Sequence, residues 1–195
     1  MTKNFFTIAI VGILLLAQTQ AEELQVGFAQ ISITPDIIDE WVDVNDDAQF
    51  DPDIDLWTDV NGNGKFDAVW MAGFQNKRPA QGVKDNLMAV AVVIDDGKNR
   101  IGIVTADTVG LMRKFVLGVR EAVPAELGLD YLMVHATHNH EGPDTQGLWG
   151  PGFFSSGVDP DYMEQLQQNI LDALSQAIVN VYIQVSTLEK EYNLG

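Results

Sequence analysis

Residues 87–107, LMAVAVVIDDGKNRIGIVTAD, contain the strongest structural signal in the chain. Leu87 to Ile94 and Ile101 to Thr105 are continuous apolar runs, separated by the turn sequence DDGKN. Apolar runs of this length, bounded by Asp, Gly and Asn, are typical of buried strands. We therefore predict two neighbouring strands joined by a hairpin.

The residues after this hairpin have the order of an α/β unit. Asp107 ends the second strand, and apolar residues then recur at helical spacing from Leu111 to Leu127, until Gly128. Leu129 to Val134 predicts the next strand. Open α/β sheets bind their ligands at the carboxyl ends of parallel strands, so the residues that follow these two strands are candidates for a functional site.

Further elements lie on either side of this unit. Leu24 to Thr34 predicts a first strand, in which Gly27 indicates a bulge or a close approach of two backbones. Asp159-Pro160 predicts the start of a helix whose apolar stripe continues to Val181, and Ile183 to Val185 predicts a last strand. The chain then stops in a polar stretch without a closing element. We expect an α/β fold with a mixed sheet flanked by helices, as the front part of a larger domain.

The composition narrows the class of protein. The 195 residues carry a formal net charge of −17, which is unfavourable for nucleic-acid binding. Met1 to Ala21 is typical of a signal peptide, because Lys3 precedes an apolar run from Phe5 to Ala17; an uncleaved signal anchor is the alternative. We predict a secreted or periplasmic protein that begins at Glu22, forms one domain over 22–195 and has no transmembrane segment after cleavage. The oligomeric state is open.

The chain has no cysteine, so an exported protein of this sequence must be stabilised by core burial or bound metal. An acidic insertion, about residues 36–67, contains eleven acidic residues and one lysine. Within it WVDVNDDAQFD (41–51) recurs 16 residues later as WTDVNGNGKFD (57–67). The repeat resembles the short loops of dockerin-like and thrombospondin-like calcium modules, although it lacks the final glutamate of an EF-hand. A solvated acidic loop is the alternative. The predicted calcium ligands are Asp43, Asn45, Asp47, Gln49 and Asp51 in loop 1, and Asp59, Asn61, Asn63, Lys65 and Asp67 in loop 2.

All three histidines lie in VHATHNHEGP, residues 134–143, where a strand is expected to end. Side chains two apart in an extended segment point to the same face, so His138 and His140 can address one ion while His135 points away. Zinc suits neutral imidazoles, and a catalytic zinc ion needs three protein ligands and one open position. Asp107 is a candidate further ligand, or the group that orients an imidazole. The alternatives are a polar rim of histidines and a capping role for Asp107.

These segments together resemble the front of the neutral/alkaline ceramidase family. The resemblance rests on VGF (26–28) with ISITP (31–35), on VTAD (104–107) and above all on ATHNHEGP (136–143), where the family has Thr-His-Thr-His-Ser-Gly-Pro. It extends over most of 26–185, interrupted by the acidic insertion. In that family a zinc ion activates water to hydrolyse the amide bond of an N-acylated sphingoid base.

The resemblance implies roles for individual residues. His138 matches the family's metal ligand, and His140 matches the histidine that contacts the substrate carbonyl or its oxyanion. The family's other ligands, a His, a Glu and a Tyr, lie further along its chain, so these residues form half of a zinc site unless local groups such as Asp107, Glu141 or Asp144 act as replacement ligands. Ser32, Glu141 and Asp144 replace the family's Asp, Ser and Gly, which leaves the substrate open.

We therefore expect the N-terminal part of an exported zinc-dependent amidase of neutral ceramidase type, acting on a small-molecule or lipid amide. Two other hypotheses fit the same residues. One is a secreted, calcium-stabilised binding or scaffold protein whose histidines are structural. The other is a hydrolase of a soluble ester or amide on the same framework.

Overall fold

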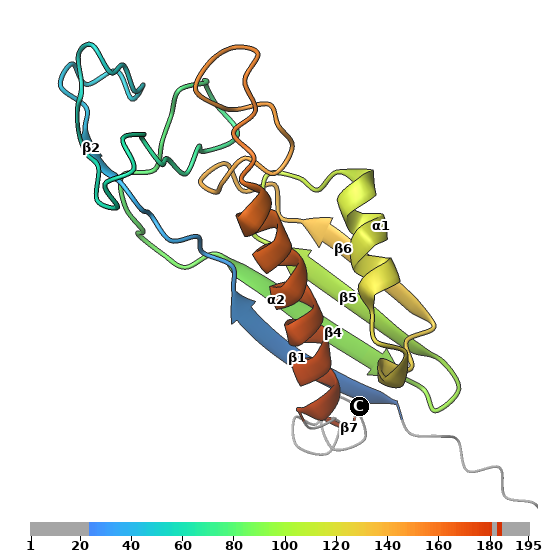
Figure 1. The fold of residues 1–195 in the computed structure, drawn as a ribbon. Coiled ribbons are helices and arrows are strands. Elements are labelled where there is room, and N and C mark those ends of the chain that lie inside the picture. Colours follow the sequence, from blue (N-terminus) through green and yellow to red (C-terminus); the bar gives the residue numbers. More distant parts are fainter. Residues whose placement is uncertain (1–23, 181–182, 185–195) are drawn as a thin grey trace, which may run out of the picture.

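The computed structural model describes residues 24–180 and 183–184. Its main feature is a sheet in the order β6-β5-β4-β1-β7, in which β5 and β6 are parallel and the other pairs antiparallel (Figure 1). This mixed sheet confirms the predicted fold class. The predicted signal peptide, Met1 to Ala21, lies outside the described residues, as do Val181 and Val185. The strands of the sheet are β1 (Gln25–Ser32), β4 (Met88–Asp95), β5 (Arg100–Ala106), β6 (Tyr131–Ala136) and β7 (Ile183–Gln184).

Strands β4 and β5 form the predicted hairpin at the centre of the sheet. Asp95 and Arg100 lie opposite each other at its turn, with 2.8 Å between the guanidinium and the carboxylate. The N–H of Gly97 and then the Arg100 guanidinium hold the pKa of Asp95 below its usual value. Polar contacts therefore fix the turn end of this apolar hairpin.

The helix after β5 is shorter than its apolar spacing predicts. Helix α1 (Arg113–Ala122) ends at Ala122, and a separate 3-10 turn, η1 (Ala125–Leu127), follows it. Pro124 explains the break, because proline lacks the N–H that a helix needs and disfavours helical backbone in the residue before it. Val123 accordingly has a ψ of 121°. The expected single helix from Leu111 to Leu127 is therefore wrong.

Helix α2 (Pro160–Val179) begins where the sequence predicts. The Asp159 carboxylate accepts a hydrogen bond of 2.9 Å from the N–H of Asp161, and the proline takes the first helical position. Leu166 and Leu174 on its inner face are fully buried. The helix packs across β1 and β4, and this contact forms the core.

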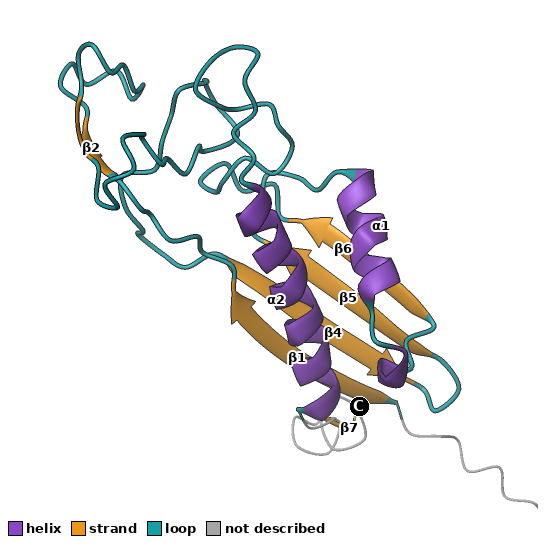
Figure 2. Cartoon of the chain, in the orientation of Figure 1, coloured by secondary structure: helices purple, strands orange, loops and turns teal. Residues whose placement is uncertain are grey.

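Gly27 allows α2 to lie directly against β1. A Cβ atom on Gly27 would overlap the carbonyl oxygen of Ala177, so the close backbone approach expected at this glycine is present. Helices α1 and α2 cover the same face of the sheet (Figure 2). Among the described residues no helix covers the opposite face, where Phe28, Tyr131 and Met133 are exposed.

The acidic insertion packs its two sequence repeats against each other. Strands β2 (Glu40–Val42) and β3 (Leu56–Thr58) pair antiparallel, with their central tryptophans directly opposite. The last aromatic residues of the two copies, Phe50 and Phe66, stack with ring centroids 4.0 Å apart. The repeat therefore has a structural counterpart in two similar halves that share aromatic contacts. In the part of the chain that the structure describes, no helix is long and apolar enough to span a membrane.

Candidate functional site

The chain turns after β6 and does not stay extended. Thr137 still donates its N–H to the carbonyl of Ala106 at 3.0 Å, but His138 has a φ of 65°, which is uncommon for a residue with a side chain. The assumption of an extended segment is therefore wrong, because strand β6 ends at Ala136. The two imidazoles still meet: Nε2 of His138 lies 3.2 Å from Nε2 of His140.

His135 lies apart from this pair. It belongs to β6, and its side chain is exposed on the sheet face without helices. Its Nε2 lies 2.9 Å from the hydroxyl of Thr105 on the neighbouring parallel strand. The alternation of side chains along a strand thus separates His135 from the other two histidines, as the sequence predicts.

A backbone carbonyl orients the ring of His138. Nδ1 lies 2.7 Å from the carbonyl oxygen of Val109, a buried residue shortly after β5. A carbonyl oxygen can only accept, so Nδ1 carries the hydrogen and Nε2 of the neutral ring has a free lone pair. Val109 therefore fills the orienting role that the sequence suggests for Asp107.

The ring of His140 is held by the loop that precedes Pro79. Gly73 has a φ of 100°, and a Cβ atom there would overlap the imidazole. The ring of Phe74 stands edge-on to it, with centroids 5.3 Å apart. The ring thus occupies a space that exists because residue 73 is a glycine.

Arg78 ties this loop to the histidine segment. Its guanidinium donates to the carbonyls of Ala72 at 2.6 Å and His140 at 2.7 Å, and to the Glu141 carboxylate at 3.2 Å. It also lies over the ring of Phe74, 4.8 Å from the centroid. No local sequence pattern identifies Arg78, because the contact joins residues 62 positions apart.

The distance between the two histidines fits zinc. Two nitrogen ligands at about 2.0–2.1 Å from a tetrahedral zinc ion lie about 3.3 Å apart, and the two Nε2 atoms are separated by 3.2 Å. The described residues contain no group of three His, Cys, Asp or Glu side chains that could hold a metal ion. The chain therefore brings together two suitable imidazoles, one fewer than the three ligands of a catalytic zinc ion.

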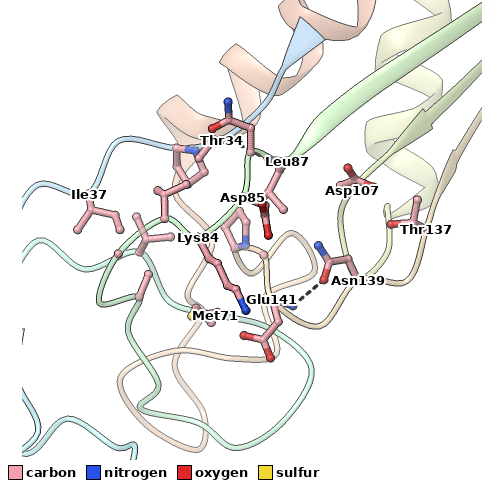
Figure 3. Close-up of a pocket in the computed structure, with 18 residues that line it drawn as sticks. Thr34, Ile37, Met71, Lys84, Asp85, Leu87, Asp107, Thr137, Asn139 and Glu141 are labelled. Carbon is pink, nitrogen blue, oxygen red and sulfur yellow. Dashed lines mark hydrogen bonds between the residues drawn. The ribbon is translucent and has the colours of Figure 1, made fainter. Parts of the chain in front are cut away.

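Asp107 lies beside a different space. Its carboxylate accepts a hydrogen bond of 2.9 Å from the N–H of Met88 and lines a cavity of about 740 Å³ (Figure 3). Thr137, Asn139 and Glu141 line the same cavity, whereas His138 and His140, which alternate with them, do not. The structure therefore does not bring Asp107 together with the histidine pair. Asp107 instead caps the start of β4.

Asp144, a possible replacement ligand, is also occupied. Its carboxylate is fully buried and accepts four hydrogen bonds of 2.8–3.1 Å, from the N–H groups of Gln146, Gly147, Trp149 and Gly157. These bonds organise the loop between the histidine segment and α2. Asp144 is therefore a loop anchor, which its position after Gly-Pro did not reveal.

Two solved structures share this fold. The neutral ceramidase from Pseudomonas aeruginosa superposes with a TM-score of 0.56 at 18% sequence identity, over 82% of this chain and 22% of that chain. A ceramidase complexed with C2 gives a TM-score of 0.55, with the same identity and coverage. The chain has a ceramidase-like fold. It spans 22% of the length of each of these proteins. No protein-family model matches the sequence, and no curated protein matches it.

The two acidic loops turn sharply at equivalent positions. Positions 4 and 6 have positive φ values in both copies, at Asp46 and Ala48 and at Gly62 and Gly64. The carboxylate at position 1 points into each loop and accepts backbone N–H groups from its far side, as Asp43 does from Ala48 at 2.7 Å. The residues predicted as calcium ligands are therefore gathered around two turns. Within these described loops, seven of the ten residues accept N–H groups through side-chain oxygens: Asp43, Asp47, Asp51, Asp59, Asn61, Asn63 and Asp67.

Proposed function

We propose that this chain is part of an exported zinc-dependent amidase of neutral ceramidase type, which hydrolyses an N-acyl amide bond with water. The observation that carries the proposal is the approach of Nε2 of His138 to Nε2 of His140 at 3.2 Å, at a strand end of a ceramidase-like fold. Because both matched structures are ceramidases, a lipid amide is the substrate class that we propose.

The two histidines would have different tasks. His138 would bind the metal through Nε2, since its Nδ1–H donates to Val109. A bound zinc ion lowers the pKa of its water ligand to about 7 and polarises a carbonyl group. His140 would donate a hydrogen bond to the substrate carbonyl oxygen as that atom gains negative charge. Gly73 and Arg78 would keep its ring in place. The remaining zinc ligands would come from residues outside the described ranges.

The experiment uses the complete polypeptide and measures zinc content together with hydrolysis of ceramide and of a short soluble N-acyl amine. We expect His138→Ala to remove both zinc and turnover. His140→Ala should keep zinc and lower kcat by about 10²–10³-fold, the usual effect of losing one donor to an oxyanion. His135→Ala is the matched control and should change neither. A native protein without zinc, or turnover that survives His138→Ala, would reject the proposal.

We also propose that the two acidic loops bind calcium as a structural cofactor. The repeated ligand spacing and the positive φ values at positions 4 and 6 support it. Many close carboxylates repel one another unless cations lie between them. Export is consistent with this proposal, because extracellular calcium is abundant enough for weak sites.

A further inference from the structure

The loop before α2 carries two phenylalanines that are almost completely exposed. Phe153 is 81% and Phe154 is 97% exposed, although phenylalanine is among the residues most often buried. Their rings lie edge to face, with centroids 5.1 Å apart. Leu148 in the same loop is 59% exposed. The loop therefore presents a small apolar tip to its surroundings.

This tip is narrow, and backbone contacts and hydrogen bonds hold its base. Its two arms touch at Gly150 and Gly157, where a Cβ atom would overlap the backbone of the opposite arm. The N–H of Ser155 donates to the carbonyl of Gly152 at 3.0 Å and closes the turn between the arms. The buried Asp144 carboxylate holds the base. The phenylalanines thus sit on a thin, well-anchored projection.

The base of this projection touches the histidine site. The indole Nε1 of Trp149 donates to the carbonyl of Phe74 at 3.1 Å, and the ring of Phe74 contacts His140. The loop, coloured orange, extends past the end of the sheet at which β5 and β6 finish (Figure 1). A surface that received the tip would therefore lie beside the two imidazoles.

The charge of the loop selects the kind of surface. Residues 146–158 contain no charged side chain, in a chain with a net charge of −17. No basic residue of this loop can attract an anionic membrane, and the remainder of the protein repels one. A protein partner of standard size would need about 800 Å² of contact on each side, which a two-residue tip cannot supply. A lipid surface without net charge requires neither basic residues nor a large contact area.

We infer that Phe153 and Phe154 insert into the surface of a zwitterionic lipid bilayer and hold the histidine pair next to a membrane-resident amide. The choice of a lipid surface rests on the proposed function, since a lipid amide must be taken from a membrane. Insertion removes both rings from water, and this apolar transfer is the driving force.

The test measures binding to phosphatidylcholine vesicles by flotation. The protein prepared for this test starts at Glu22, so that it lacks the apolar N-terminal segment and keeps all residues that the structure describes. We expect the double variant Phe153→Ser/Phe154→Ser to bind at least tenfold more weakly, with an unchanged melting temperature because both side chains are exposed. Val179→Ser changes another exposed apolar residue, at the far end of α2, and should bind like the native protein. Vesicles with added phosphatidylserine should bind the native protein less.

Three results would overturn the inference. They are a native protein that does not bind phosphatidylcholine vesicles, equal binding by the double variant, and self-association without lipid that the double variant abolishes, which would assign the tip to a second copy of the chain. Vesicle binding needs no turnover, so its result is independent of the amidase assay. Vesicle binding without amide hydrolysis would support the membrane-binding tip and reject the proposed amidase reaction.

Discussion

Asp39 and Asp55 each hold the opposite half of the acidic insertion. Asp39 precedes the first repeat, yet its buried carboxylate accepts the N–H groups of Val60 at 2.9 Å and Asp67 at 2.7 Å in the second. Asp55 precedes the second repeat and makes the equivalent two bonds, of 3.0 Å and 2.7 Å, to the positions 16 residues earlier in the first. The repeat thus begins two residues before its tryptophan, and each half of the insertion depends on the other.

Replacing Asp39 with alanine is expected to lower the free energy of unfolding by about 2–4 kcal/mol, because two backbone N–H groups lose a charged acceptor in a buried place. Asp55→Ala should have a similar effect. Urea unfolding followed by tryptophan fluorescence reports the change, since Trp41 and Trp57 lie inside the insertion. Asp53→Ala, at an exposed position, is the control. If Asp39→Ala were no less stable than this control, the hydrogen bonds from the Asp39 carboxylate to the second repeat would not contribute to stability.

Calcium is expected to raise the melting temperature, because a ligand that binds the folded state stabilises it by mass action. At a free calcium concentration 100 times the dissociation constant, each site would add about 2.7 kcal/mol. Asp43→Ala/Asp59→Ala removes the first ligand of both loops and should remove the gain, whereas Asp36→Ala, outside the repeats, should keep it. Differential scanning calorimetry with calcium and with a chelator measures the shift. An identical melting temperature in both conditions would count against calcium binding.

The elements that the sequence predicted correctly have local causes. The β4–β5 hairpin follows from two apolar runs around a polar turn, and the start of α2 from one capping aspartate and one proline. The error in α1 also has a local cause. Pro124 breaks the helix, but the helical spacing of apolar residues continues beyond it. The prediction followed this spacing, although the proline alone was sufficient to indicate the end of the helix.

The histidine site could be located from the sequence but not built from it. Clustering identified His138 and His140, because neighbours in the chain must be neighbours in space. The groups that hold them come from elsewhere: the Val109 carbonyl from 29 residues away and the Arg78 guanidinium from 62. Such contacts depend on where the sheet places its loops in space. A local sequence pattern does not predict this placement. The positive φ of His138 is likewise set by its tertiary surroundings, as nothing in the residue type requires it.

Gly73→Ala is expected to lower kcat by about 10–100-fold and to leave the zinc content unchanged, because it disturbs the ring of His140, the proposed donor to the substrate carbonyl, and not the metal ligand His138. The added methyl group would displace the His140 ring, and alanine is strained at a φ of 100°. Gly82→Ala is the matched control, because a Cβ atom there meets no other atom within 4 Å. Amide hydrolysis and zinc content are measured for both variants. Equal kcat values in the two variants would show that the position of the His140 ring does not matter for the reaction.

Tyr162→Phe tests how α2 is held to the end of β1. The Tyr162 hydroxyl donates to the carbonyl of Ile33 at 3.0 Å, and burial raises the pKa of this phenol above its ordinary value of 10. An unfolded tyrosine therefore loses its proton near pH 10 while the folded one keeps it, so the free energy of unfolding falls as the pH rises above 10. Tyr162→Phe should cost about 0.5–1.5 kcal/mol at pH 7 and reduce that fall.

Urea unfolding at pH 7 and at several values above pH 10 measures both effects of Tyr162→Phe. Tyr131→Phe, in which an exposed tyrosine is changed, serves as the control and should follow the native pH dependence. The comparison uses the difference between each variant and the native protein, because lysine side chains also titrate in this range and contribute equally to all three proteins. If the native protein and Tyr162→Phe lost stability with the same slope above pH 10, the fall would have another source and the buried phenol would not be the group that ionises on unfolding.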